Sequence, residues 1–296
     1  MHLTDNIVVL GDRHFPIYLL GADRAVILEG GVSSVVPLIK RQVEQLKKPI
    51  KIDYTVIMHA HFDHICGIPG LRKLFPEMKV AATEESAKIL QRPKIVANFF
   101  KEDAALLEAQ GDGQNPSDTM PELPPETIKV DRIIKDGEQW QLDGKNINFY
   151  QAPGHSYCSI MAYIPEDQVL FCSDSTGFPI DDKRIFPIYF TGYKDYLATI
   201  EKMKSFPISI LACAHERIIH GEKLVKEYLS LAISEAEKVM SCVVGAWRRG
   251  EDQKTISSVL FNKFYTGNLK IYSEQNIKMC CDLLAIRSLQ AAGIQL

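Results

Sequence analysis

Residues 59–64 read His-Ala-His-Phe-Asp-His and place three of the chain's eight histidines within six consecutive positions. The stretch directly follows a short apolar run that is typical of a strand buried on both faces. In an extended chain, residues two apart point to the same side, so His59 and His61 can converge on one metal ion. Asp63 and His64 come where the chain must turn into the next helix, and they can therefore face a second ion. Imidazole and carboxylate ligands suit zinc, iron or manganese, so we expect a transition-metal site.

Around this stretch, short β-rich runs alternate with segments of helical periodicity. The predicted strands cover residues 7–10, 17–20, 25–28, 54–58, 78–82, 127–134, 139–142, 147–151, 160–164, 169–172 and 208–212. The predicted helices of the same region cover residues 36–46, 68–75, 84–90, 94–109 and 193–205. Residues 111–125 are rich in Gly, Pro and Asp and are predicted to form a surface loop. Strand–helix–strand alternation of this kind predicts an α/β architecture.

From residue 222 onward the chain becomes helical in pattern, with apolar residues at helical spacing. We therefore divide the chain into an α/β domain over residues 1–221 and a C-terminal helical subdomain over residues 222–296. The apolar stripe of such helices must be buried against the α/β body or against a partner chain. We expect this helical tail to form a roof over the metal site. The sequence leaves open whether two copies of the chain form a homodimer.

The stretch at 59–64 resembles the His-x-His-x-Asp-His signature of the metallo-β-lactamase superfamily. That family has further ligands at the ends of later strands, and this chain has matching stretches in the family's order. They are Ala152-Pro153-Gly154-His155-Ser156, Leu170-Phe171-Cys172-Ser173-Asp174 and Leu211-Ala212-Cys213-Ala214-His215-Glu216. The resemblance covers about residues 5–221 and implies an αββα sandwich, here followed by the helical tail.

Carried over residue by residue, the resemblance implies a centre with two divalent transition-metal ions (Zn, Fe or Mn). It assigns His59, His61 and His155 to the first ion, Asp63, His64 and His215 to the second, and Asp174 to a bridge between them. Two ions about 3.5–4 Å apart can hold a hydroxide between them and lower the pKa of water from about 15.7 toward ~7. Asp63 is the predicted catalytic residue, which orients the hydroxide or returns a proton.

Four further residues are predicted not to be metal ligands themselves. Glu29 stands where the family usually has an acidic residue before a glycine, and we expect it to support a metal ligand. We expect His14 at the surface and His220 outside the metal site, because the strand ends at His215. Cys66 is expected to be a core thiol.

Composition and charge exclude several classes of function. The chain has 34 basic and 37 acidic residues and a formal net charge of −3, without a clustered basic run, which argues against a nucleic-acid partner. No apolar run approaches the length of a membrane span, so we expect no membrane partner. The first residues lack the pattern of a secretory signal, and the seven cysteines fit buried reduced thiols better than a disulfide framework. We therefore expect a cytoplasmic protein that acts on a small molecule.

Four stretches carry a closer resemblance within the superfamily: Val9-Leu10-Gly11-Asp12, Leu28-Glu29-Gly30-Gly31, Leu170-Phe171-Cys172-Ser173-Asp174 and the helical tail from about Glu222. On these, the chain is similar nearly end to end to the quinolone-signal response thioesterases, which hydrolyse 2-aminobenzoylacetyl-CoA. This resemblance implies a thioesterase that acts on an acyl-CoA type of substrate. Two departures prevent transfer of the acyl group itself: Phe178 replaces an acidic pocket residue, and His215 is not flanked by glycines. The flavodiiron branch, which has a glutamate where His61 stands, is disfavoured.

Other functions remain open from the sequence. A glyoxalase II-like enzyme and a lactone hydrolase fit the same motifs, and a regulatory binding protein that retains a metal site is an alternative of another class.

For a thioesterase, the aromatic side chains expected to favour an apolar or aromatic acyl group are Phe178, Phe186, Tyr189 and Tyr193. The candidate contacts for CoA phosphates are Arg92, Lys94, Lys183 and Arg184.

Overall fold

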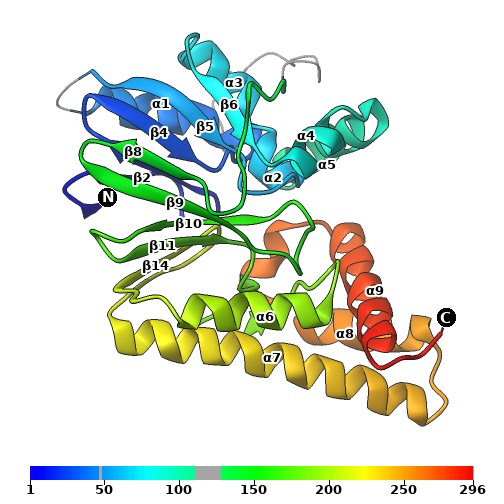
Figure 1. The fold of residues 1–296 in the computed structure, drawn as a ribbon. Coiled ribbons are helices and arrows are strands. Elements are labelled where there is room, and N and C mark those ends of the chain that lie inside the picture. The colour runs from blue at the N-terminus through cyan, green and yellow to red at the C-terminus, as the bar shows by residue number, and fades with distance from the viewer. Residues whose placement is uncertain (47–48, 111–127, 296) are drawn as a thin grey trace.

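Alternate residues of the strands pack into two separate hydrophobic cores, and this alternation gives the molecule its layers. Successive side chains of a strand point to opposite faces of the sheet. In β3 (Pro16–Gly21), Tyr18 and Leu20 join a core made by residues of both sheets, whereas Ile17 and Leu19 join a core shared with helices. Because strands of both sheets do this, the two sheets pack face to face, and helices cover their outer faces (Figure 1).

The computed structural model describes residues 1–46, 49–110 and 128–295, so the predicted loop at 111–125 lies outside the described residues. Within this part of the chain, one sheet has the strand order β1 (His2–Thr4), β2 (Ile7–Gly11), β3, β4 (Arg24–Leu28), β5 (Lys51–Val56), β6 (Lys79–Ala82) and β7 (Arg132–Ile133). The second has the order β15 (Ile218–His220), β14 (Ile210–Cys213), β11 (Val169–Ser173), β10 (Ile160–Ile164), β9 (Lys145–Gln151) and β8 (Gln139–Leu142). A small hairpin pairs β12 (Phe178–Pro179) with β13 (Ile185–Phe186).

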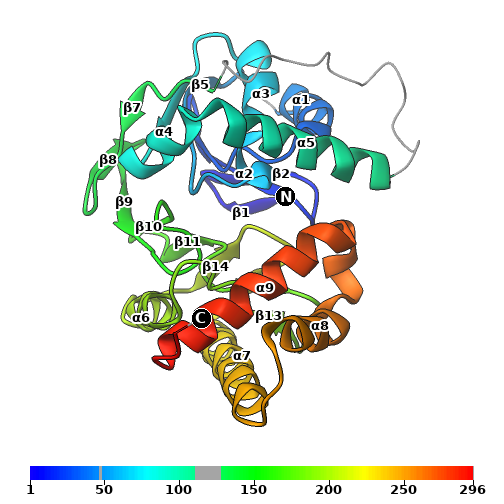
Figure 2. The ribbon, with the colours of Figure 1, turned by 90° about the vertical axis from the view of Figure 1, so that its right-hand side faces the viewer.

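The helices lie outside this pair of sheets (Figures 1 and 2). The first half of the chain has α1 (Val36–Glu44), α2 (Phe62–Ile65), α3 (Ile68–Leu74), α4 (Glu84–Leu90) and α5 (Pro93–Gln110). The second half has α6 (Tyr193–Lys204), α7 (Glu222–Arg248), α8 (Gln253–Phe264) and α9 (Glu274–Ala291), and short 3₁₀ helices form at η1 (Ser33–Val35) and η4 (Gly267–Ile271). Figure 1 shows α1 and α3 on one side of the sandwich and α6 and α7 on the other.

The predicted αββα sandwich with a helical C-terminal region is confirmed. The predicted strand over 127–134 is wrong in length, because only β7 pairs with β6, at one edge of its sheet. The short elements β1, α2, β12, β13 and β15 were not predicted, since each has five residues or fewer and carries little periodicity.

The helical tail does not stand apart from the sandwich. Val225 of α7, Leu260 of α8 and Leu284 of α9 belong to the same buried cluster as Leu170 of β11 and Ile200 of α6. Because the tail and the sandwich share this core, the packing does not separate two domains, and the domain boundary after residue 221 stays a prediction.

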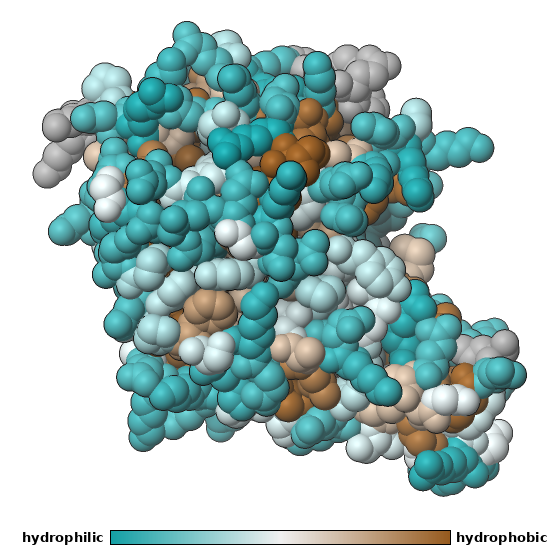
Figure 3. All heavy atoms as spheres, viewed as in Figure 1, coloured by the Kyte–Doolittle hydropathy of each residue, from teal (hydrophilic) through white to brown (hydrophobic). Residues whose placement is uncertain are grey.

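Hydrophobic side chains are mainly interior. On the face seen in Figure 3, hydrophilic residues dominate and hydrophobic ones form separate patches. In the part of the chain that the structure describes, no helix combines the length and the apolar character needed to cross a membrane.

Candidate metal centre

The ends of several strands bring the predicted ligands to one edge of the sandwich. β9, β11 and β14 run in the same direction, because β10 is antiparallel to both β9 and β11, and β11 is parallel to β14. His155, Asp174 and His215 come shortly after these three strands and therefore reach the same edge. From the other sheet, β5 leads to His59 and then to α2, which carries Asp63 and His64.

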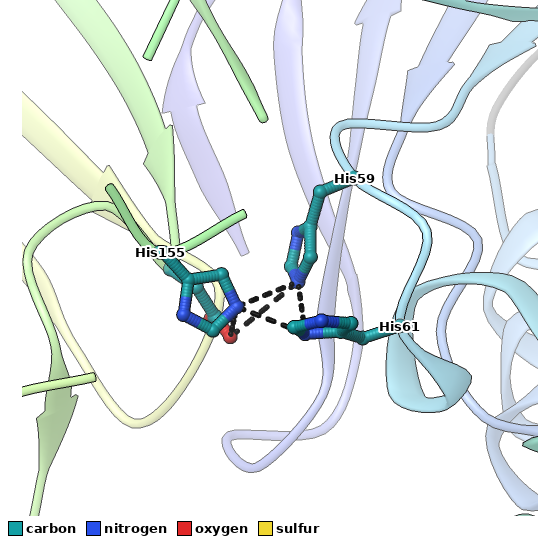
Figure 4. A group of neighbouring side chains, drawn as sticks. His59, His61 and His155 are labelled. Carbon is teal, nitrogen blue, oxygen red and sulfur yellow. Dashed lines mark hydrogen bonds and ion pairs between the residues drawn. The ribbon is translucent and has the colours of Figure 1, made fainter. Parts of the chain in front are cut away.

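The first group of ligand atoms comes from His59, His61, His155 and Asp174 and spans no more than 4.8 Å. The Nε2 atoms of His59 and His155 are 3.1 Å apart, and Nδ1 of His61 lies 3.1 Å from the former and 2.9 Å from the latter. Figure 4 shows the three rings converging, those of His59 and His61 from the stretch between β5 and α2 and that of His155 from the segment after β9. Nitrogen ligands about 2.0–2.1 Å from a tetrahedral zinc ion lie about 3.3 Å from one another. The observed spacing therefore suits a shared ion.

The second group comes from Asp63, His64 and His215, and Asp174 lies between the two groups. Nε2 of His215 is 3.5 Å from Oδ2 of Asp63 and 3.2 Å from Oδ1 of Asp174. Oδ2 of Asp174 is 3.5 Å from Nε2 of His64 and 3.3 Å from Nε2 of His155. One carboxylate thus contacts both groups.

The outward-facing nitrogens of the imidazole rings are held by acceptors. Nδ1 of His155 donates to the carbonyl of Ile188 at 2.8 Å, and Nδ1 of His215 donates to the carbonyl of His14 at 2.7 Å. A carbonyl oxygen only accepts, so each neutral ring keeps its proton on Nδ1 and turns the lone pair of Nε2 toward the centre. Hydrogen bonds of this kind orient metal-binding histidines and fix their tautomers.

Glu29 connects the two groups through its two carboxylate oxygens. Oε2 accepts a 2.8 Å hydrogen bond from Nδ1 of His64, and Oε1 accepts a 2.6 Å hydrogen bond from the hydroxyl of Ser173. Since the one proton of Ser173 goes to Glu29, its oxygen accepts from Nδ1 of His59 at 3.2 Å. Glu29 and Ser173 both have positive φ angles, 74° and 48°, a strained conformation that concentrates at functional sites. The geometry agrees with the supporting role expected for Glu29.

Burial and charge act differently on the two groups. Burial lowers the pKa of His59 well below its usual value and that of His61 to about 3, so these rings are neutral. For His64, the neighbouring carboxylates, Glu29 first, outweigh the effect of burial and raise the pKa well above its usual value. Burial would raise the pKa of Asp174, but the rings of His64 and His215 hold it well below its usual range. The second group therefore attracts positive charge.

The residues present fit a divalent metal. Nε2 of His64, Nε2 of His215 and Oδ1 of Asp174 are buried and lack a hydrogen-bond partner. Buried polar atoms in proteins are almost always satisfied, so such atoms call for a ligand. Imidazole and carboxylate groups are the donors that divalent transition metals accept. A cation coordinated here satisfies all of these atoms at once.

A cavity of about 320 Å³ opens beside both groups, and His61, Asp63, His155 and Asp174 form part of its wall. Its other walls come from α5, from the segment 178–190 and from the tail residues of η4 and α9, and most of these side chains are apolar. The tail therefore covers the cavity on the side that faces the ligand atoms, which is the position predicted for it. Selection of a substrate by the tail stays a proposal.

Residues 13–215 match the family model described as the metallo-beta-lactamase superfamily. This match covers more than half of the chain and includes both groups of ligand residues. The chain belongs to the metallo-beta-lactamase superfamily. The fold and the site geometry described above are consistent with this membership.

Two solved structures share the whole fold of this chain. A metallo-beta-lactamase family protein from Thermus thermophilus has a TM-score of 0.66 and 16% identity, covering 99% of this chain and 95% of its own. A beta-lactamase domain protein from Burkholderia ambifaria has a TM-score of 0.68 and 14% identity, covering 99% of this chain and 89% of its own. Both superpositions extend beyond the sheets over the helical tail.

Curated relatives are matched over a smaller part of this chain and differ from it in length. A nitric oxide reductase of Moorella thermoacetica is 22% identical over 54% of this chain and 33% of its own length. A hydroxyacylglutathione hydrolase of Buchnera aphidicola is 25% identical over 72% of this chain and 66% of its own length. An atrochrysone carboxyl ACP thioesterase of Cryptosporiopsis is 22% identical over 52% of this chain and 35% of its own. The matched parts span from a third to just under two thirds of these relatives.

The histidines outside the two groups have different surroundings. His14 lies partly exposed and outside the cavity lining, in agreement with the expected surface position, and its Nδ1 contacts the carboxylate of Glu216, whose side chain is only 1% exposed. The hydrogen bond with Glu216 raises the pKa of His14. This pair holds the segment whose carbonyl orients His215. His220 lies exposed on β15, outside both groups, as expected.

Two of the four aromatic residues predicted for the pocket line the cavity. Phe178 and Phe186 line the cavity, whereas Tyr189 and Tyr193 are not among its described lining residues. The hydroxyl of Tyr189 instead contacts Ser288 of α9 at 2.7 Å. The basic candidates for CoA phosphates also lie outside the described lining: Arg92, Lys94, Lys183 and Arg184.

The cysteines are all free, and most of them are buried. Cys66 lies in the core, as expected. The expectation that the cysteines are buried is wrong for Cys242, which lies exposed on α7.

Among the polar residues of the site that sequence reasoning missed are Ser173, whose hydroxyl contacts His59, and Tyr272 in the tail. Tyr272 lines the cavity, and its hydroxyl donates a 2.6 Å hydrogen bond to Oδ2 of Asp63. It follows η4 and belongs to no motif, so nothing in the local sequence distinguishes it from a core tyrosine.

Metal affinity is expected to fall as the pH is lowered. Burial lowers the pKa values of His64 and His215, but neighbouring carboxylates outweigh it, Glu29 foremost for His64 and Asp174 for His215, so both pKa values are raised and a metal ion must displace protons that these rings hold. Each displaced proton makes the affinity about tenfold weaker per pH unit of acidification. Calorimetric Zn²⁺ titrations in buffers with different ionisation enthalpies count the released protons. Binding without proton release at neutral pH would contradict this electrostatic account.

Proposed function

We propose that this chain is a hydrolase with a binuclear metal centre that cleaves a thioester of the acyl-CoA type. The observation that supports it is the pair of ligand groups joined by Asp174 and open to one apolar cavity. The first ion is assigned to His59, His61 and His155, the second to Asp63, His64 and His215, with Asp174 shared. When bound, the ions supply a nucleophile at neutral pH, because they lower the pKa of water from about 15.7 toward ~7.

The protein's own groups are organised for hydrolysis at the wall of the cavity. Asp63 faces the cavity, is only 7% exposed, and receives a hydrogen bond from Tyr272. We assign it to orient the attacking water and to return a proton to the products. The rings of His155 and His215 are held by backbone carbonyls and so need little reorganisation as charge develops.

A thioester suits the groups that are present. In its hydrolysis, the carbonyl carbon gains a bond to a water oxygen and loses its bond to sulfur, giving a carboxylate, a thiol and one released proton. A thiol has a pKa of about 8.5, so the thiolate leaves with little help from an acid. Among the described residues that line the cavity, no histidine stands outside the two groups. These residues are less well suited to a substrate whose leaving group must be protonated by an acid before it departs.

The cavity walls favour an apolar or aromatic acyl group. Phe62, Phe99, Phe178 and Phe186 line it, and its volume of about 320 Å³ is at the lower end of the usual range for small-molecule sites. The relatives support hydrolysis at a thioester, since one is a thioesterase and another is a hydroxyacylglutathione hydrolase. No described basic residue lines the cavity, so recognition of a CoA tail is not assigned to particular residues.

The metal assignment predicts different results for two nearby histidines. His215→Ala removes a ligand of the second group and is expected to lose one of two bound ions and most of the activity. His220→Ala changes an exposed strand residue and should keep both ions. Metal content of the reconstituted, desalted proteins can be measured by mass spectrometry. Retention of both ions by His215→Ala, or loss of one by His220→Ala, would contradict the assignment.

The reaction can be tested by thiol release. The metal-loaded protein is expected to release free thiol from aromatic or apolar acyl-CoAs faster than from short polar ones, because the acyl group enters an apolar cavity. The panel should include S-lactoylglutathione, a lactone and a phosphodiester. Activity on the glutathione thioester alone would move the assignment to a glyoxalase II-like enzyme. Turnover of lactones or phosphodiesters without any thioester would reject the thioesterase, and no turnover at all would favour a binding protein.

A further inference from the structure

Tyr272 connects the helical tail to the metal centre. It lies between η4 and α9, far along the chain from Asp63, yet its hydroxyl is 2.6 Å from Oδ2 of that residue and its side chain is buried. We propose that Tyr272 is a positioning residue that holds the carboxylate of Asp63 for the second ion, so that the tail completes the metal centre. This inference rests on the proposed binuclear site.

The ring of Tyr272 is held on several sides by other aromatic rings. It packs edge-on against Phe15, Phe62 and Phe178, with centroids 6.5, 6.0 and 5.6 Å away. Such edge-to-face pairs are favourable at these spacings. The three phenylalanines come from three separate segments of the sandwich, and Phe62 and Phe178 also line the cavity, so movement of the ring would displace part of the cavity wall. The hydroxyl is therefore placed on Asp63 before any ligand binds.

The backbone of Tyr272 is fixed as well. Its carbonyl accepts a 3.0 Å hydrogen bond from the hydroxyl of Tyr265, which follows α8. The next residue, Ser273, caps the N-terminus of α9 by accepting from the amide of Asn276 at 3.1 Å. Tyr272 thus sits at a rigid junction between two helical segments of the tail.

The hydrogen bond has a defined direction and consequence. An ionised carboxylate only accepts, so the phenol is the donor. The same carboxylate contacts both histidines of its group: Oδ1 is 3.7 Å from Nε2 of His64, and Oδ2 is 3.5 Å from Nε2 of His215. A donor on Oδ2 restricts rotation of the carboxylate and keeps both oxygens beside these rings. Removal of such an outer hydrogen bond typically weakens metal affinity about 10–100-fold.

The first group lacks an equivalent contact with the tail. His59 is held by Ser173 and His155 by the carbonyl of Ile188, and both partners lie in the sandwich. Among the hydrogen bonds of the described residues, Tyr272 provides the contact from the tail to a ligand side chain. Loss of its hydroxyl should therefore weaken one ion and not the other.

The test is a Co²⁺ titration of Tyr272→Phe, followed by the visible absorption of the bound cobalt and by calorimetry. The first equivalent is expected to bind as in the unmodified protein, and the second about 10–100-fold more weakly. Tyr163→Phe is the matched control, because it removes the hydroxyl of a buried tyrosine that donates to the carbonyl of Pro207 at 2.8 Å, away from the cavity. This control should bind both equivalents normally.

Tyr265→Phe gives a second approach, because it releases the backbone of Tyr272 and leaves its hydroxyl in place. It is expected to weaken the second equivalent in the same direction but less strongly, and it keeps the proposal testable if Tyr272→Phe unfolds. Unchanged binding of both equivalents by Tyr272→Phe, or equal weakening of both, would overturn the positioning role. Binding of a single equivalent by the unmodified protein would instead contradict the binuclear site, and this inference with it.

Discussion

The carboxylate of Asp174 is the contact on which the rest of the site depends. It is only 6% exposed, and its two oxygens lie 3.2 to 3.6 Å from ring nitrogens of four histidines, His59, His64, His155 and His215. Burying so many polar groups is costly unless each finds a partner. Coordination of a divalent metal beside this carboxylate satisfies lone pairs that the protein itself leaves unpaired.

The sandwich explains how these groups meet. Strands of both sheets end at the same edge, and each ending places one or more ligands there. A second set of residues then fixes the rings: Glu29 reaches one histidine directly and another through Ser173. The tail closes the remaining side, so the surface that holds the metals and the surface that faces a substrate are built from both parts of the chain.

Much of this architecture could be predicted from the sequence, for identifiable reasons. The alternation of β-rich and helical segments predicted an α/β architecture, and the stretch at 59–64 indicated a metal site because its ligands are adjacent in the chain. The layered sandwich and the later ligands were implied by the family resemblance that this stretch carries. Tyr272 could not be found in this way, since its contact with Asp63 depends on how the tail folds back. The partnership of His14 with Glu216 was hidden for the same reason, because the two residues lie far apart in sequence.

The most direct test of the account is anomalous X-ray diffraction from crystals grown with Zn²⁺, recorded on both sides of the zinc absorption edge. Two peaks are predicted: one about 2.0–2.2 Å from the facing nitrogens of His59, His61 and His155, the other equally close to Asp63, His64 and His215. Asp174 should contact both. A single peak, or none at this edge of the sandwich, would contradict the binuclear centre.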